Sequence, residues 1–145
     1  MESRTNLLQE SPEALKAMMG LERYIAESGL DKNLYELIKL RASQLNGCAY
    51  CINMHSRDAI KLGATPQKLF LLDAWRETDL YTEKEQAVLA LTEAMTLIAT
   101  SHVPDDIYQE AARQLQPKEL NAVIMAVVTI NAWNRIAITC RTPLD

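Results

Sequence analysis

The sequence predicts an all-α protein made of a single domain. Its 145 residues are about what one domain needs to bury a core. There are only four glycines and five prolines, and Ala, Leu, Met, Glu, Lys and Gln are frequent. Apolar residues recur at helical spacing between recognisable capping signals. We therefore expect one helical domain over residues 1–145, with about six to seven helices.

Two helices are predicted in the first third of the chain. Ser11-Pro12 is typical of an N-cap followed by proline at the first helical position, and it predicts a helix over 12–28 that ends at Gly29. Asp31 can cap a second helix, which Asn46-Gly47 would end.

Three more helices are expected in the middle of the chain. One should begin around Cys48 and stop at Gly63, so it follows the second helix after a very short turn. Thr65-Pro66 predicts a helix that carries Trp75, and Thr82-Glu83-Lys84-Glu85 has the pattern of a capping box that starts the next one.

The last third predicts a helix over 104–115 and a long apolar one. Acidic residues in the first turn favour the former, and Gln116-Pro117 opens the latter. The segment 120–138 has few positions suited to solvent, so it should be central or lie in an oligomer interface. Only residues 1–10 and 140–145 look loose.

Charge and composition exclude several classes of partner. A net charge of −4 and a pI near 5.2 argue against nucleic acid or an anionic membrane surface. The N-terminus lacks the pattern of a secretion signal, and we expect no apolar run to reach the ~18 residues of a membrane span. With three cysteines, an odd number, we expect a reducing compartment and a cytoplasmic location.

Candidate functional residues concentrate in Gly47–His55. In a helix, Cys48, Cys51 and His55 lie on one stripe together with apolar residues, so two thiols and an imidazole face the core. Buried polar groups are expected to have partners or a function. Cysteines three apart can close a reducible disulfide, and a helix N-terminus lowers a thiol pKa, which by itself favours Cys48 as nucleophile.

Other interpretations of these residues remain open. The cysteines could be two small buried hydrophobes. Together with His55 they could also supply three zinc ligands, but a structural zinc site needs a fourth, for which only His102 and Cys140 remain.

Several residues outside Gly47–His55 have side chains that could take part in a site or a contact. We expect His102 on the surface, Cys140 to be a spectator, and Trp75, Trp133 and Phe70 in the core or in a subunit contact. Three polar residues that close the apolar segment either cap and pair locally or anchor a neighbouring helix or subunit; they are Asn131, Asn134 and Arg135.

Glu36 is a weak signal from spacing alone. A lone Glu on a helix is usually solvated. In a simple antiparallel hairpin through Asn46-Gly47, Glu36 would lie nearer Lys61 than His55.

Taken together, the motif resembles that of a known family. Glu36, eleven residues, Cys48-x-x-Cys51, three residues and His55 are similar to the signature of AhpD-like alkylhydroperoxidases in the carboxymuconolactone decarboxylase superfamily. Residues 131–136, Asn-Ala-Trp-Asn-Arg-Ile, also resemble a recurrent C-terminal segment of its small members. The resemblance covers about residues 15–139.

The resemblance implies an AhpD-like helical fold assembled as a trimer or hexamer, and a thiol peroxidase activity without metal or cofactor. It makes Cys51 the peroxidatic thiolate, Cys48 the proton donor and resolving thiol, and Glu36 with His55 a water-assisted proton relay. This reverses the ranking of the cysteines by the helix dipole. One departure is Tyr50, where some members carry a second histidine.

The implied partners are a hydroperoxide substrate and an external dithiol, which in better-known members is a lipoyl group on a carrier protein. Two alternatives are a non-catalytic redox switch or oligomeric binding protein, and the lactone or decarboxylase chemistry that names the superfamily.

Overall fold

The computed structural model describes residues 1–145 and confirms the all-α prediction. It contains ten helical segments and no strand. In chain order they are α1 (Leu7–Glu10), α2 (Pro12–Glu27), α3 (Lys32–Asn46), α4 (Ala49–Lys61), α5 (Pro66–Phe70), the 3₁₀ helix η1 (Leu72–Glu77), α6 (Glu83–Thr96), α7 (Ile98–Ser101), α8 (Asp105–Gln114) and α9 (Pro117–Cys140).

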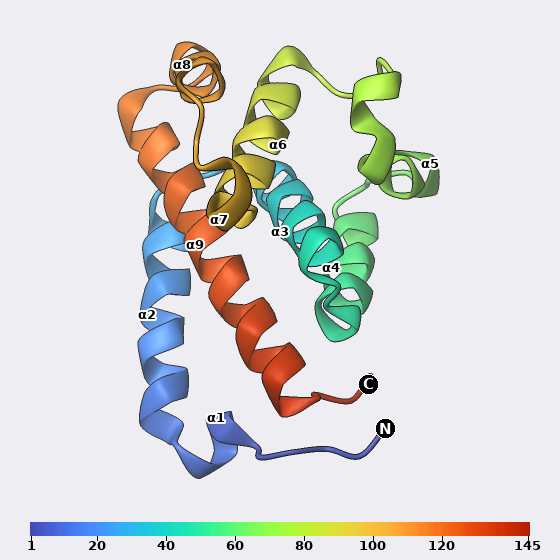
Figure 1. Cartoon of the computed structure of the whole chain (residues 1–145), viewed down its shortest axis with the longest axis vertical. Coiled ribbons are helices and arrows are strands. Elements are labelled where there is room, and N and C mark those ends of the chain that lie inside the picture. Colours follow the sequence, from blue (N-terminus) through green and yellow to red (C-terminus); the bar gives the residue numbers. More distant parts are fainter.

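Helix α3 lies at the centre and packs against α4, α6 and α9 (Figure 1). Its buried side chains serve two separate hydrophobic clusters. Leu34, Ile38 and Ala42 belong to the larger cluster, which contains side chains of α2, α6, α8 and α9. Leu37 and Leu40 belong to the smaller one, with side chains of α4, α5, η1 and α6. Because apolar residues occupy two faces of α3, this helix is enclosed on most sides.

Helix α9 is the long apolar helix that the sequence predicts. An 18-residue window within it has a mean hydropathy of 1.5, so by length and composition it is apolar enough to cross a membrane, contrary to our expectation that no segment is. Packing accounts for this composition. Val123, Ala126 and Ile130 are fully buried in the larger cluster, and α9 contacts α2, α3 and α6.

The helix predicted after Thr65-Pro66 is broken into two. Residues 66–70 form α5, and residues 72–77 form η1, in which Ala74 departs from helical geometry (φ −114°, ψ 31°). Trp75 enters the smaller cluster, as expected for a core residue. Phe70 is 82% exposed, so its assignment to the core is wrong and only the subunit contact stays a prediction.

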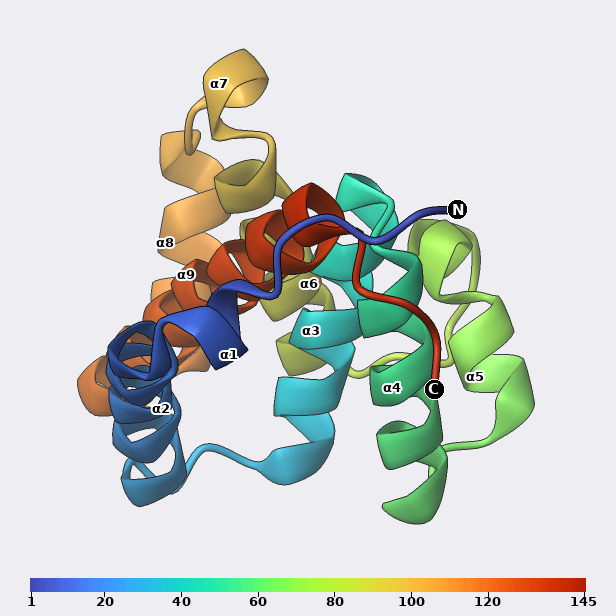
Figure 2. The ribbon, with the colours of Figure 1, turned by 90° about the horizontal axis from the view of Figure 1, so that it is seen from below.

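The N-terminal residues are more ordered than the sequence suggested. Asn6 caps α1, and the backbone N–H of Arg4 donates to the carbonyl oxygen of Cys140 at 3.1 Å. Figure 2 shows the N-terminal segment passing the end of α9 and reaching the neighbourhood of α4. Both chain ends therefore lie at the end of the bundle where α3 turns into α4.

Candidate active site

The turn between α3 and α4 presents the two cysteines. Gly47 adopts a left-handed conformation (φ 69°) that ends α3, a geometry that glycine tolerates without steric cost. Cys48 follows directly as the N-cap of α4, and its Sγ accepts the N–H of Cys51 at 3.3 Å. The predicted start of this helix is thus confirmed to within one residue.

Cys48 and Cys51 are joined by a disulfide, with their Cα atoms 5.3 Å apart. Both residues are buried, at 1% and 2% exposure. The two sulfurs are therefore bonded to each other. The interpretation of the cysteines as two small buried hydrophobes did not predict this bond.

Glu36 lies beside His55, which the hairpin argument did not predict. Its Oε2 is 3.4 Å from Nδ1 of His55, and its Oε1 is 2.7 Å from Nζ of Lys39. All three side chains are buried. A simple antiparallel hairpin, which would place Glu36 nearer Lys61 than His55, therefore does not describe how α3 and α4 pack.

These contacts set the charge of Glu36. Burial by itself raises the pKa of a carboxyl, but the contacts with His55 and Lys39 outweigh it and hold the pKa of Glu36 below its ordinary value. A carboxylate in contact with a buried imidazole is well suited to orient the ring and to share a proton with it. The site therefore holds an ionised acid next to the histidine of the motif.

A cavity of about 460 Å³ opens beside this cluster. Cys51, His55 and Lys39 line it, whereas Cys48 does not. Most of the remaining wall is apolar and comes from α1, α2, α4 and α9: Leu8, Met19, Met54, Trp133, Ile136 and Ala137. Of the two disulfide-bonded residues, only Cys51 lines this cavity.

Sequence reasoning missed Lys39 and Glu22, two charged residues of the cavity wall. Lys39 lies one turn after Glu36, a spacing that signals an ion pair, and its Nζ is 4.0 Å from the centroid of the Tyr35 ring. Glu22 accepts hydrogen bonds from the hydroxyl of Tyr35 and from Nε1 of Trp133 at 3.0 Å. No local pattern connects α2, α3 and α9, so Glu22 could not be found from spacing.

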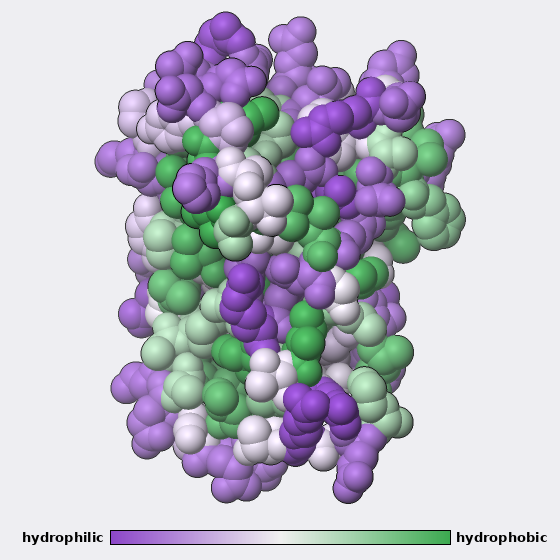
Figure 3. All heavy atoms as spheres, viewed as in Figure 1, coloured by the Kyte–Doolittle hydropathy of each residue, from purple (hydrophilic) through white to green (hydrophobic).

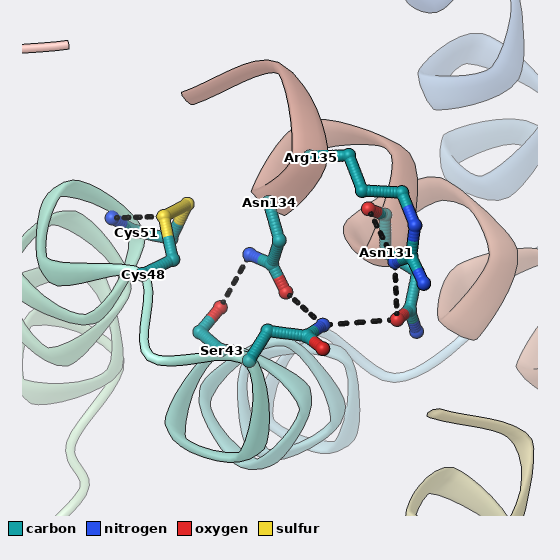
Figure 4. Close-up of a disulfide and its surroundings, with 7 residues drawn as sticks. Ser43, Cys48, Cys51, Asn131, Asn134 and Arg135 are labelled. Carbon is teal, nitrogen blue, oxygen red and sulfur yellow. Dashed lines mark hydrogen bonds between the residues drawn. A yellow bond between two sulfur atoms is a disulfide. The ribbon is translucent and has the colours of Figure 1, made fainter. Parts of the chain in front are cut away.

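Polar side chains of α9 fix the end of α3 just before the disulfide (Figure 4). The amide nitrogen of Asn46 donates to Oδ1 of both Asn131 and Asn134 at 2.9 Å. Asn134 is fully buried and donates to Oγ of Ser43 at 3.0 Å. These bonds join the two helices, while the contacts of Arg135 stay local, with Asn131.

The remaining candidates lie elsewhere or have other roles. His102 is exposed in the loop after α7, as expected, and Cys140 is a buried free thiol at the end of α9. Ligand atoms of Glu36, His55 and Asp58 lie within 4.8 Å of one another, a spacing compatible with a metal ion. The ammonium group of Lys39 already neutralises one oxygen of Glu36, which disfavours a cation there.

Comparison with known proteins finds a match over nearly the whole chain and a shorter match. The chain is 41% identical over 138 residues to the uncharacterized protein YdfG of Bacillus subtilis, covering 95% of this chain and 94% of YdfG. The shorter match is to the alkyl hydroperoxide reductase AhpD of Coxiella burnetii. It is 46% identical over 39 residues and covers 27% of this chain and 22% of AhpD.

Among solved structures, the Agrobacterium tumefaciens protein ATU0492 superimposes with a TM-score of 0.95 at 40% identity and covers 99% of both chains. ATU0492 is described as a protein of unknown function and a candidate antioxidant defence protein AhpD. The debrominase Bmp8 shares the fold, with a TM-score of 0.84 at 21% identity over 95% of this chain and 74% of Bmp8. The carboxymuconolactone decarboxylase family model matches residues 12–94, and this chain therefore belongs to the carboxymuconolactone decarboxylase family, as an AhpD-like member.

Proposed function

We propose that this protein is a thiol-dependent peroxidase that reduces hydroperoxides through Cys51 and Cys48. The observation that carries the proposal is the disulfide itself, placed so that Cys51 shares a cavity with His55 and Lys39. A carboxylate behind the imidazole, Glu36, supplies a second proton-holding group. The match to AhpD and the description of ATU0492 support the same chemistry.

In the proposed cycle, the Cys51 thiolate attacks one oxygen of the hydroperoxide. The O–O bond breaks, the sulfur becomes a sulfenic acid, and the other oxygen leaves as alcohol after receiving a proton. His55, held by Glu36, relays that proton through water. The Cys48 sulfur then attacks the sulfenic sulfur, water leaves, and the observed disulfide forms.

The lining of the cavity suits a hydroperoxide substrate. A hydroperoxide with an apolar body can lie against the wall of Leu8, Met54 and Ile136 while its O–O group reaches Cys51. An external dithiol, such as a lipoyl group on a carrier protein, would return the disulfide to two thiols.

We also propose that the chain works as a homo-oligomer, a trimer or hexamer. Helix α2 exposes Leu15, Met19 and Tyr24, and α9 exposes Val128. Figure 3 shows apolar residues gathered over the middle of the face where α2 and α9 lie, with hydrophilic residues towards both ends. Exposed apolar area of this kind is typical of subunit contacts.

The decisive experiment measures peroxide consumption with dihydrolipoamide or dithiothreitol as reductant. Cys51→Ser should abolish turnover, and Cys48→Ser should prevent disulfide formation and slow it strongly. Cys140→Ser is the matched control, since this buried free thiol lies outside the cavity of Cys51, and it should retain activity. Full activity in Cys51→Ser would refute the proposal.

The same assay separates an enzyme from a switch. Peroxide turnover no faster than that of free thiols, together with a reversible change of assembly on oxidation, would instead identify a redox-responsive binding protein.

A further inference from the structure

We propose that a second cavity, which lies over Cys48, binds the reductant, and that it selects small dithiols carrying a carboxylate. This inference rests on the proposed function, because it concerns the half-reaction that reopens the disulfide. In it, a carboxylate pairs with Arg4 and Arg141 while a thiolate of the same molecule attacks the Sγ of Cys48.

The two cysteines face different cavities. Cys51 lines the 460 Å³ cavity that also contains His55, and Cys48 lines another of about 310 Å³. The second cavity is walled by the turn between α3 and α4, the end of α9 and the N-terminal segment, and Tyr50 contributes to both cavities. Each cysteine thus borders its own cavity.

The second cavity is cationic. The residues that line it include Arg4 and Arg141 and no Asp or Glu. One guanidinium nitrogen of Arg4 donates to the carbonyl oxygen of Thr139 at 3.2 Å, and the side chain of Arg141 makes no ion pair or hydrogen bond within the chain. Two arginines without acidic partners, in a chain of net charge −4, favour an anionic ligand.

The backbone holds these arginines in place. The N–H of Arg4 donates to the carbonyl oxygen of Cys140, and Arg141 ends α9 in a left-handed conformation (φ 52°). The backbones that carry both residues are therefore fixed against the end of α9 (Figure 2). Fixed backbones lower the entropy that is lost when the site orders around a carboxylate.

The chemistry balances with the dithiol as the only added reactant. One thiolate attacks Sγ of Cys48, the S–S bond breaks, and Cys51 leaves as the thiolate that the peroxide step requires. The second thiol of the ligand, after losing its proton, then attacks its own sulfur in the mixed disulfide. This oxidises the ligand to a cyclic disulfide and releases Cys48 as a thiolate that takes up a proton.

The test follows reduction of the protein disulfide without peroxide, by mass spectrometry of alkylated thiols. Dihydrolipoic acid and dihydrolipoamide are the matched probes, because they carry the same dithiol and differ in the charge of a distant group. At low ionic strength the acid should react about two- to five-fold faster with the wild type, as expected for a partly exposed ion pair, and salt should reduce this ratio.

Replacing both arginines, Arg4→Gln with Arg141→Gln, should bring the ratio of acid to amide close to one. Arg23→Gln, which removes one exposed charge from α2 outside either cavity, should keep the wild-type ratio. Equal rates for the two probes with the wild type, or a ratio that survives the double substitution, would overturn the inference. Because no peroxide is present, loss of the proposed peroxidase activity alone would leave this result unaffected.

Discussion

Glu36 and His55 meet across the interface of α3 and α4, with Oε2 of the acid 3.4 Å from Nδ1 of the imidazole. The other oxygen of Glu36 is held by Lys39, so one carboxylate joins two positively chargeable groups. This places the charge balance of the site on three buried side chains rather than on the Cys-His motif alone.

Removing Lys39 should change the pH dependence of peroxide reduction. In Lys39→Met, burial is no longer offset by the ammonium group, so the pKa of Glu36 rises. On acidification the carboxylate of Glu36 then takes up its proton at a higher pH than in the wild type. The acidic limb of the rate–pH profile should therefore move to higher pH. Lys61→Met, an exposed residue at the end of α4, is the control. An unchanged acidic limb in Lys39→Met would show that Glu36 does not limit the rate.

The contact between Asn134 and the end of α3 should stabilise the fold. Asn134→Ala removes hydrogen bonds with Asn46 and Ser43 at a fully buried position. We expect a loss of about 2 kcal/mol in the free energy of unfolding, because the amide of Asn46 and the hydroxyl of Ser43 each lose a partner. Urea denaturation measures it, and the exposed neighbour Arg135→Ala should change stability by less than about 0.5 kcal/mol. Equal losses in both variants would contradict this role.

Glu93 should make the stability depend on pH. Burial raises the pKa of its carboxyl, but hydrogen bonds from Arg76, Arg41 and Trp75 outweigh burial and lower it. A lowered folded-state pKa gives stability that is present above the unfolded pKa of about 4.3 and lost as the pH falls through the folded value. Glu93→Gln should therefore destabilise the protein near pH 7, and the difference from the wild type should shrink below about pH 4.3. A difference that does not vary with pH would argue against this ionisation.

Substitutions of Phe70 and Leu72 should differ in how much they destabilise the fold. Leu72 is fully buried, so Leu72→Ala should cost about 3 kcal/mol in the free energy of unfolding. Phe70→Ser should cost less than about 0.5 kcal/mol in an isolated subunit, because the ring is exposed. Light scattering then tests the subunit contact. A smaller assembly in Phe70→Ser supports the contact, and an unchanged assembly rules it out.

The helices and their boundaries were largely predictable, because caps and apolar spacing are local signals. Asp31 caps α3, and Thr82 with Glu85 forms the predicted capping box. The break between α5 and η1 was not predictable, since Leu72 and Trp75 continue the helical spacing while the backbone at Ala74 departs from it. Trp75, which follows Ala74, packs in the smaller cluster, and spacing along the chain does not report such a tertiary contact.

The candidate site was predictable only in part. Cys48 is the N-cap of α4, and Cys51 and His55 lie within this helix. Their clustering therefore follows from their spacing in the sequence. The contact of Glu36 with His55 depends on how α3 crosses α4, and the roles of Glu22 and Trp133 depend on α2 and α9 meeting at the same cavity. Such relationships arise between segments far apart in the chain, where no periodicity reports them.

The hydrogen bond from the Cys51 amide to the Cys48 sulfur links covalent state to local helix stability. On reduction the acceptor becomes a thiol or a thiolate, and a thiolate accepts this bond more strongly at a helix N-terminus. The first turn of α4 and the oxidation state of the pair are thus thermodynamically coupled. The Cys51 amide proton offers a single-atom reporter of that coupling, readable by its chemical shift and its rate of exchange with solvent.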